Sequence, residues 1–287
     1  MKNSIESIKA RLKNISDKEN IDYQLILVRY FHERFLYRLS ISRYKDHFML
    51  KGGNLLYAIS GLSSRPTMDI DFLGVQLSYS IEEIKNKFVE ICKIDYPVDT
   101  VTFEAESIIV EPITAQDKYR GVRLFIKSNL GSIRHLLQID IGFGDIVTPS
   151  PCCLSYPVLL VDSDAPTIIA YSNETVIAEK FQAMIELSAF NSRMKDFFDV
   201  YNLLKNENFD KNILRDAIYA TFRNRNTSYK ENHILFSPDF VENENRLIMW
   251  NAFLRKIKFK ENLRFNLVHS EICSVLKPIW EEMKIKP

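Results

Sequence analysis

The sequence predicts an α+β protein in which a region of mixed strands and helices is followed by a helical domain. Up to about residue 42, apolar residues recur at three- and four-residue steps, the period of a helix with one apolar face: Leu25, Val28, Phe31, Phe35 and Leu39. From about 47 to 160 strand and helix patterns are mixed, and from about 174 the helical period runs to the C-terminus. Prolines at 149, 151, 157 and 166 punctuate the join, so we expect a first domain over 1–165 and a second over 166–287.

The elements follow from the local patterns. Strands are expected at Phe48–Lys51, Met68–Gly74, Val98–Phe103, Ser107–Glu111, Val122–Ser128 and His135–Phe143. Helices are expected at Gly53–Ser60 and Ile81–Ile94, and then at 174–190, 194–205, 210–223, 241–258 and 263–285. All eight glycines lie between Gly52 and Gly144, so tight turns and close backbone approaches should concentrate there.

The composition is that of a globular protein. Hydrophobic residues make up 46% of the 287 residues and charged residues 26%, with a formal net charge of +1. A nucleic-acid binder usually carries a clear basic excess, so any such surface must be local. The charged N-terminus lacks the apolar core of a secretory signal, and no apolar run reaches the roughly 20 residues of a membrane helix. We therefore expect a cytoplasmic protein without a membrane partner.

The four cysteines and five histidines show no metal-ligand spacing. Adjacent Cys152 and Cys153 fit neither a zinc site nor a disulfide framework, which favours ordinary thiols in a reducing compartment. The histidines are scattered, and we treat His135, which precedes the last expected strand, as structural. No motif supports Ser/His/Asp chemistry.

Two aspartates lie in the strand expected at Met68–Gly74. Side chains alternate between the faces of a strand, so Asp69 and Asp71 share one face while Ile70 and Phe72 point into the core. Two carboxylates about 7 Å apart repel each other unless a cation lies between them. A divalent ion is the usual solution, and oxygen ligands suit Mg²⁺, with Mn²⁺ as the alternative. The competing interpretation is a solvated face, because Asp-x-Asp pairs are common.

A third acid, Asp140, lies in the middle of the strand expected at His135–Phe143. The apolar residues Leu137, Ile139 and Ile141 form one face of this strand, and Asp140 lies on the other. An acid in such a strand is costly unless it is paired or bound to a cation. If the two strands are neighbours, Asp140 completes a three-carboxylate site that can hold two metal ions.

A Gly-Gly pair precedes the acidic strand by one short helix. Glycines at a strand-to-helix junction let backbone amides approach a phosphate, and the start of the helix adds a favourable dipole. Gly52 and Gly53 occupy such a junction, and Asn54 can cap the helix or bind a phosphate oxygen. The alternative is a tight turn without a ligand.

Two stretches together resemble the AbiEii toxin family of nucleotidyltransferases. The first is Leu50-Lys51-Gly52-Gly53-Asn54-Leu55-Leu56, followed by Arg65-Pro66-Thr67 and Asp69-Ile70-Asp71-Phe72. The second is Glu179-Lys180-Phe181, followed by Arg193-Met194-Lys195-Asp196-Phe197-Phe198-Asp199-Val200-Tyr201. Their order and spacing cover roughly residues 47 to 205.

The resemblance implies a polymerase-beta-like nucleotidyltransferase core with a mixed sheet, followed by a helical domain that contributes to the active site. It implies a toxin of a bacterial toxin–antitoxin or abortive-infection (phage-defence) system, paired with a separately encoded antitoxin that often carries a winged helix. Members of the MenT type add nucleotides to transfer RNA. One departure affects the identity or affinity of the nucleotide, because this superfamily usually has Ser or Thr where this chain has Asn54.

Lys180 lies at the border of the apolar stripe of the helix expected at 174–190. From the residues alone, we interpret it as a lysine whose stem packs while its ammonium group reaches water. The resemblance implies instead that Lys180 binds the triphosphate. The other expected nucleotide contacts are Lys51, Gly52, Gly53, Asn54 and Arg65.

The helix expected at 194–205 carries the second acidic motif. The resemblance implies an essential acid here, which we assign to Asp196 at the border of the apolar stripe. Asp199 is the weaker candidate, either a surface acid or a partner of Arg193 or Lys195. Arg65, just before the acidic strand, can pair with a phosphate or with Asp196.

Together these residues predict transfer of a nucleoside monophosphate from a nucleoside triphosphate to an acceptor, with release of pyrophosphate. Asp69 and Asp71 are expected to bind both metal ions, and Asp140 to bind metal and help activate the acceptor hydroxyl. The acceptor is left open between an RNA end such as that of tRNA, a protein hydroxyl and a small molecule. The alternative function is a catalytically inactive nucleotide-binding or protein-interaction module on the same fold, which Asn54 would support.

A local basic segment occurs in the second domain. Residues 255–264 (RKIKFKENLR) hold five basic residues and one acid, and Arg223 and Arg225 form a second basic pair. The segment predicts contact with RNA phosphates. The alternative is a solvated helix end, whose cations favour the C-terminal dipole.

Overall fold

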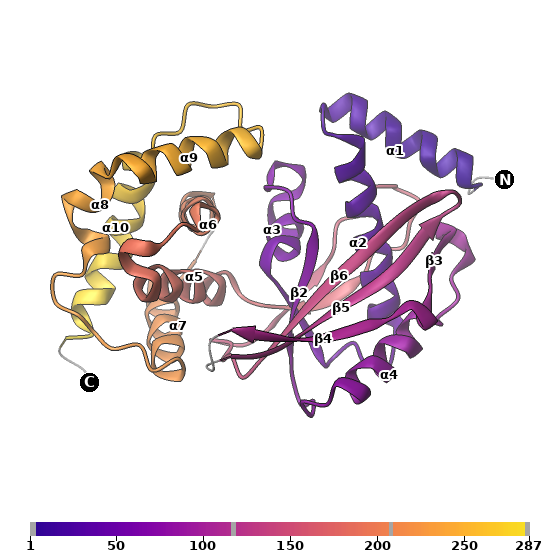
Figure 1. The fold of residues 1–287 in the computed structure, drawn as a ribbon, viewed down its shortest axis with the longest axis horizontal. Helices are drawn as coiled ribbons and strands as arrows, with labels where there is room; N and C mark the ends of the chain where they lie inside the picture. Colours follow the sequence, from indigo (N-terminus) through magenta and orange to yellow (C-terminus); the bar gives the residue numbers. More distant parts are fainter. Residues whose placement is uncertain (1–3, 116–118, 207–208, 285–287) are drawn as a thin grey trace. The chain divides into compact units, whose positions relative to one another are not determined.

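The chain forms two compact units. Figure 1 shows the ribbon, coloured along the sequence from the N-terminus in indigo to the C-terminus in yellow. The structure is a computed structural model that describes residues 4–115, 119–206 and 209–284. The first unit comprises Met1–Gly144 and Cys152–Ala170, and the second Asp145–Pro151 and Tyr171–Pro287. The proline-rich join is therefore a double crossing, in which the chain enters the second unit, returns to the first and leaves it again.

Two helices open the first unit, α1 (Ile5–Glu19) and α2 (Tyr23–Ile41). They confirm the helical pattern predicted for this region, of which residues 1–3 lie outside the described residues. The helices separate where Asn20 adopts a left-handed conformation (φ 52°) and Asp22 caps α2 by accepting from the Gln24 amide. Most of α2 is buried, and it contacts β6 and β8 of the sheet.

A mixed sheet of eight strands forms the centre of the described part of the first unit, and it confirms the predicted fold class. The strands are β1 (Phe48–Lys51), β2 (Asp69–Gly74), β3 (Val101–Phe103), β4 (Ile109–Ala115), β5 (Tyr119–Leu130), β6 (Ile133–Phe143), β7 (Cys152–Ser155) and β8 (Thr167–Ala170). Their order is β3-β5-β6-β2-β1-β8-β7, with β4 paired to β5. β2 runs parallel to β6 and antiparallel to β1, so the two acid-bearing strands are neighbours.

Alternating apolar side chains hold this sheet in place. Ile70 and Phe72 of β2 and Ile139 of β6 are fully buried, and each such side chain contributes about 1.5–3 kcal/mol. Phe72 packs against Phe48 of β1, which in turn meets Phe88 of α4 (Ile81–Cys92). The predicted helices α3 (Gly52–Ser60) and α4 are both present.

Parts of the sheet differ from the prediction. The strand predicted at Val98–Phe103 begins only at Val101, because Pro97–Asp99 form a 3-10 turn. Asp99 is buried there and accepts two hydrogen bonds from Arg38 of α2, at 2.7 and 3.0 Å, which fixes the turn. The strand predicted at Ser107–Glu111 is found at Ile109–Ala115. The strands β7 and β8, which lie in the proline-rich join, were not predicted from the sequence.

The second unit is helical throughout its regular elements in the described residues, as predicted. Its helices are α5 (Asn173–Leu187), α6 (Met194–Asn206), α7 (Lys211–Asn224), α8 (Pro238–Glu242), α9 (Glu244–Lys256) and α10 (Phe265–Glu282). The helix predicted at 241–258 is two helices, because Asn243 is extended and its side chain caps α9 by accepting from the Arg246 amide. Residue 285, the end predicted for the last helix, lies outside the described residues.

Aromatic side chains form the core of the second unit, where Phe181 of α5, Phe222 of α7 and Trp280 of α10 meet. All four cysteines of the chain are free, as the sequence predicts. None of the helices in the described ranges combines the length and the apolar character needed to cross a membrane.

Candidate metal centre and active site

The two faces of β2 separate core residues from acids. Ile70 and Phe72 are fully buried, whereas Asp69 and Asp71 are partly exposed on the opposite face. The alternation predicted from the sequence is confirmed. It arises because a strand presents successive side chains to opposite sides, so a buried apolar face forces both aspartates to the other.

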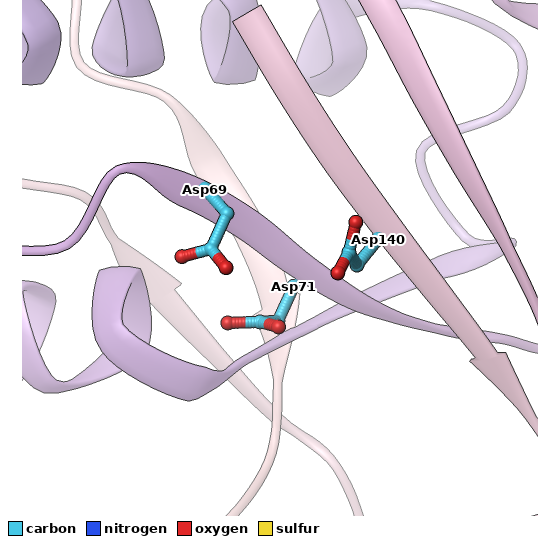
Figure 2. A group of neighbouring side chains, drawn as sticks. All are labelled: Asp69, Asp71 and Asp140. Carbon is cyan, nitrogen blue, oxygen red and sulfur yellow. The ribbon is translucent and has the colours of Figure 1, made fainter. Parts of the chain in front are cut away.

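β6 places the third acid beside the first two. Asp140 pairs in register with Asp71, while its neighbours Ile139 and Ile141 are buried on the other face. Each of Asp69, Asp71 and Asp140 can offer one carboxylate oxygen, and these atoms all lie within 4.8 Å of one another. Figure 2 shows the three side chains converging from the two neighbouring strands. We call these three residues the acidic face.

Arg123 of β5 compensates part of this negative charge. It pairs in register with Asp140 and donates from Nε to Oδ1 at 2.8 Å and from Nη2 to Oδ2 at 2.6 Å. The hydrogen bond to Asp140 raises the pKa of Arg123, and the charges of Asp140 and Asp69 act in the same direction, although partial burial opposes them. Sequence reasoning missed Arg123, because its partner depends on a strand register that no local pattern reveals.

Gly52 and Gly53 bring the main chain close to the acidic face. Gly52 has a φ of 66°, and a Cβ there would lie 1.9 Å from Oδ2 of Asp71. A Cβ on Gly53 would lie 2.5 Å from the side chain of Thr67. The predicted close approach at this junction is therefore present, and it is made toward Asp71 and Thr67. Phosphate binding by these glycines stays a prediction.

Thr67 and Lys51 also border the acidic face. The Thr67 hydroxyl donates to Oδ1 of Asp69 at 2.8 Å. Lys51 pairs in register with Asp71. Its ammonium nitrogen lies close to Gly142 of β6, because a Cβ added to Gly142 would be 3.8 Å from it. A phosphate role for Lys51 and for Arg65, which lies in the segment before β2, stays a prediction.

Asn54 does not cap α3. The N-cap position is Lys51, which makes no side-chain capping bond, and Asn54 lies within the first turn of the helix. Its side chain is 1% exposed and hydrogen-bonded to other protein groups, including the main-chain carbonyl of Asp69. These hydrogen bonds do not test the phosphate contact predicted for Asn54, which stays a prediction.

Lys180 of the second unit lies in a compact cluster of charges. Its ammonium nitrogen donates to Oδ1 of Asp196 at 2.7 Å and to Oδ2 of Asp199 at 2.8 Å. Arg193 adds an ion pair to the other oxygen of Asp196 at 2.7 Å. We call Lys180, Arg193, Asp196 and Asp199 the lysine cluster. Catalytic roles for Lys180 and Asp196 stay predictions.

The lysine cluster corrects two sequence interpretations. Asp199 is 3% exposed and pairs with Lys180, so it is not a surface acid. The side chain of Lys180 is 13% exposed and its ammonium group binds carboxylates rather than reaching freely into water. Burial raises the pKa of Asp196, but the charges of Lys180 and Arg193 outweigh burial and hold it below its ordinary value.

Arg225 is not part of a basic surface. Its guanidinium group pairs with Asp145 at 2.8 Å and Glu179 at 3.3 Å, and its side chain is 12% exposed. Arg225 is therefore engaged with acids of the second unit, whereas Arg223 is exposed, and an RNA contact of this pair stays a prediction. Within residues 255–264, by contrast, the basic side chains are exposed.

Two solved structures from Helicobacter pylori have a similar fold. A candidate nucleotidyltransferase from H. pylori is 12% identical, covers 93% of this chain and 99% of its own, and gives a TM-score of 0.51. JHP933 from Helicobacter pylori is 12% identical, covers 92% of this chain and 95% of its own, and gives a TM-score of 0.50. A comparison with curated proteins gave no match.

The sequence defines the family more closely. The profile described as "Nucleotidyl transferase AbiEii toxin, Type IV TA system" matches residues 34–274. The chain therefore belongs to the AbiEii nucleotidyltransferase toxin family, and the predicted family membership is confirmed. The match contains all three members of the acidic face as well as the lysine cluster.

Proposed function

We propose that this chain is a metal-dependent toxin that transfers a nucleoside monophosphate from a nucleoside triphosphate to an acceptor hydroxyl. The observation that carries the proposal is the convergence of Asp69, Asp71 and Asp140, with ligand atoms within 4.8 Å of one another. Membership of a nucleotidyltransferase toxin family supports the class of reaction.

The donor set of the acidic face fits a hard divalent cation. It consists of carboxylates alone, the ligands that Mg²⁺ and Mn²⁺ prefer, and their spread suits one ion or two adjacent ions. When bound, such ions would neutralise the carboxylates and the phosphate oxygens of the nucleotide.

In the proposed reaction, the acceptor oxygen forms a bond to the α-phosphorus and the bond to the pyrophosphate oxygen breaks. The hydroxyl proton passes to a base, for which Asp140 is our candidate. Arg123 donates to both Asp140 oxygens and Nε2 of Gln138 donates to Oδ1 at 3.2 Å, so Oδ2 is the oxygen that keeps a second lone pair to accept the proton. Arg123 also holds this carboxylate in one orientation.

Further contacts to the triphosphate belong to the same proposal. The first turn of α3, entered through Gly52 and Gly53, offers main-chain amides that the helix itself cannot satisfy. Lys51 and Arg65 are the nearby cations that we assign to phosphate. Lys180 and Asp196 are retained on the resemblance of their motifs.

RNA, with tRNA as the first candidate, is the acceptor that we favour. Five basic residues of the segment 255–264 are exposed: Arg255, Lys256, Lys258, Lys260 and Arg264. Replacing the first four by Gln should weaken RNA binding and flatten its salt dependence, since each phosphate contact adds about 0.7–0.9 to the log–log slope. An unchanged slope, measured with triphosphate affinity as the control, would show that this segment does not hold the acceptor.

The remaining biological context follows from the family. A type IV toxin–antitoxin system implies a separately encoded antitoxin as partner. We propose that the protein acts in the cytoplasm, where nucleoside triphosphates and tRNA are available, and that its activity serves abortive infection.

Incubation of the full chain with each labelled nucleoside triphosphate, Mg²⁺ or Mn²⁺ and total RNA tests the proposal. We expect label in an RNA or protein fraction with the wild-type chain and with Asp95→Asn, which changes an exposed acid of the same unit. Asp69→Asn should abolish labelling. A folded wild-type chain that labels no acceptor with any nucleotide would instead favour the inactive binding module.

A further inference from the structure

The side chain of Asn54 joins three other parts of the first unit. Its Oδ1 contacts the Tyr156 hydroxyl at 2.9 Å and Nδ1 of His32 at 3.1 Å. Its Nδ2 donates to the main-chain carbonyl of Asp69 at 2.6 Å. Asn54 is 1% exposed, so its polar atoms are bonded to the protein and not to solvent.

The chemistry of the partners fixes the orientation of the amide. A main-chain carbonyl only accepts, so the amide nitrogen of Asn54 must face Asp69 and its oxygen must face Tyr156 and His32. Both Tyr156 and His32 must then donate, and the neutral ring of His32 carries its proton on Nδ1. Burial lowers the pKa of His32 to about 3, so the ring stays neutral near physiological pH.

The hydrogen bond to Asp69 takes the place of a strand contact. The register between β1 and β2 ends at the pair Lys51 and Asp71, because the chain turns into α3 at Gly52. Asp69 lies beyond that end, where β1 can no longer supply a main-chain donor. The Asn54 amide supplies one from the first turn of the helix that follows β1.

We propose that Asn54 is a positioning residue that fixes the start of β2, and with it the direction in which the Asp69 carboxylate enters the metal centre. This inference rests on the proposed function. Asp69 is then held twice, at its carbonyl by Asn54 and at its carboxylate by the Thr67 hydroxyl. Asn54 acts on the metal ligand and does not contact the nucleotide.

Mn²⁺ affinity without nucleotide provides the test. Mn²⁺ is titrated into the full chain, and the free ion is followed by electron paramagnetic resonance at a temperature where each variant is folded. Asn54→Leu keeps the size of the side chain and removes its polar atoms, and we expect Mn²⁺ affinity to fall about 10-fold or more. Tyr156→Phe removes one of the bonds that orient the amide and should lower affinity by a smaller factor.

Ser128→Ala is the matched control. It removes a hydrogen bond of the same unit, from the hydroxyl of the buried Ser128 to the His135 carbonyl, and it leaves the acidic face unchanged. We expect wild-type Mn²⁺ affinity for this variant, which separates a loss of position at Asp69 from a general loss of stability.

Wild-type Mn²⁺ affinity in folded Asn54→Leu would overturn the proposal. If Asn54→Leu lowers only the affinity for triphosphate, Asn54 is a phosphate ligand, and this result would overturn the proposal too. If Asn54→Leu does not fold, Tyr156→Phe decides, and unchanged Mn²⁺ affinity in that variant overturns the proposal. Equal Mn²⁺ binding by the wild-type chain and Asp69→Asn would show that the metal centre itself is wrong. That result would contradict the proposed function as well as this inference. The results named above for Asn54→Leu and Tyr156→Phe would contradict the inference alone.

Discussion

The acidic face of the first unit and the lysine cluster of the second both hold carboxylates close together, and they compensate the negative charge in different ways. The acidic face gathers three carboxylates that remain partly exposed, and Arg123 forms a bidentate pair with one of them. The lysine cluster sets two acids against two cations, with the side chains of Asp196 and Asp199 0% and 2% exposed.

The difference shows what each cluster is suited to do. Like charges held together by the fold store repulsion, which a bound divalent cation relieves, so the acidic face is ready for a ligand. The lysine cluster has balanced charges and buried acids, so its members have their partners already, and removal of the mostly buried Lys180 leaves uncompensated negative charge in the interior. We therefore expect substitutions in the acidic face to change function and those in the lysine cluster to change stability.

The largest effect should come from the acidic face. Asp69→Asn should lower nucleotidyl transfer by about three orders of magnitude or more, because several kcal/mol of transition-state stabilisation depend on the metal ion. The melting temperature should stay the same or rise, since one repelling charge is lost. Full activity at wild-type expression, with Asp95→Asn as control, would remove Asp69 from the metal centre.

The lysine cluster should show the opposite pattern. Lys180→Met leaves two buried acids with Arg193 as the remaining cation of the cluster, and we expect a loss of about 3–5 kcal/mol in the free energy of unfolding. Chemical denaturation measures this loss. The surface variant Lys277→Met, which breaks an exposed pair with Glu281, should lose at most about 0.5 kcal/mol.

Lys180→Met also tests the predicted triphosphate contact, in a folded sample studied by calorimetry. A contact to phosphate should appear as a loss of about 1.5–3 kcal/mol in triphosphate binding. Unchanged binding together with the stability loss would leave Lys180 a structural residue and sharpen the contrast between the two regions.

A third effect concerns acid pH. The pKa of Asp196 is lower in the folded chain than in the unfolded chain, so its ion pairs stabilise fully above the unfolded value of about 3.9, and that stability is lost as pH falls through the folded value. The difference in unfolding free energy between the wild-type chain and Asp196→Asn should therefore stay constant above about pH 5 and shrink as the pH falls below about 4. A difference that grows as the pH falls would contradict the assigned ion pairs.

Arg123 should give the smallest effect. Arg123→Gln should lower the stability of the metal-free chain by only about 0.5–1 kcal/mol, because its side chain is 38% exposed and solvent screens the pair. With one cation fewer beside Asp140, added Mn²⁺ should raise the melting temperature more in the variant than in the wild-type chain. An equal or smaller rise would show that Arg123 supports the metal centre rather than only compensating its charge.

The sequence alone determined which residues face which way. Period-two alternation in β2 and β6 assigned Asp69, Asp71 and Asp140 to the polar faces, because burying one face of a strand leaves only the other for charge. Helical periodicity assigned the second unit to helices, and the motifs identified the family. These properties are local, so nearby residues encode them.

Tertiary structure decided which partners these residues meet. The register that brings Arg123 to Asp140 and the packing that encloses Asn54 join residues far apart in the chain. The same holds for the burial of Asp199 against Lys180 and for the 3-10 turn at Asp99, held by Arg38 of α2. A local pattern encodes the face on which a side chain lies, but its partner depends on the register and packing of other elements, which only the folded chain sets.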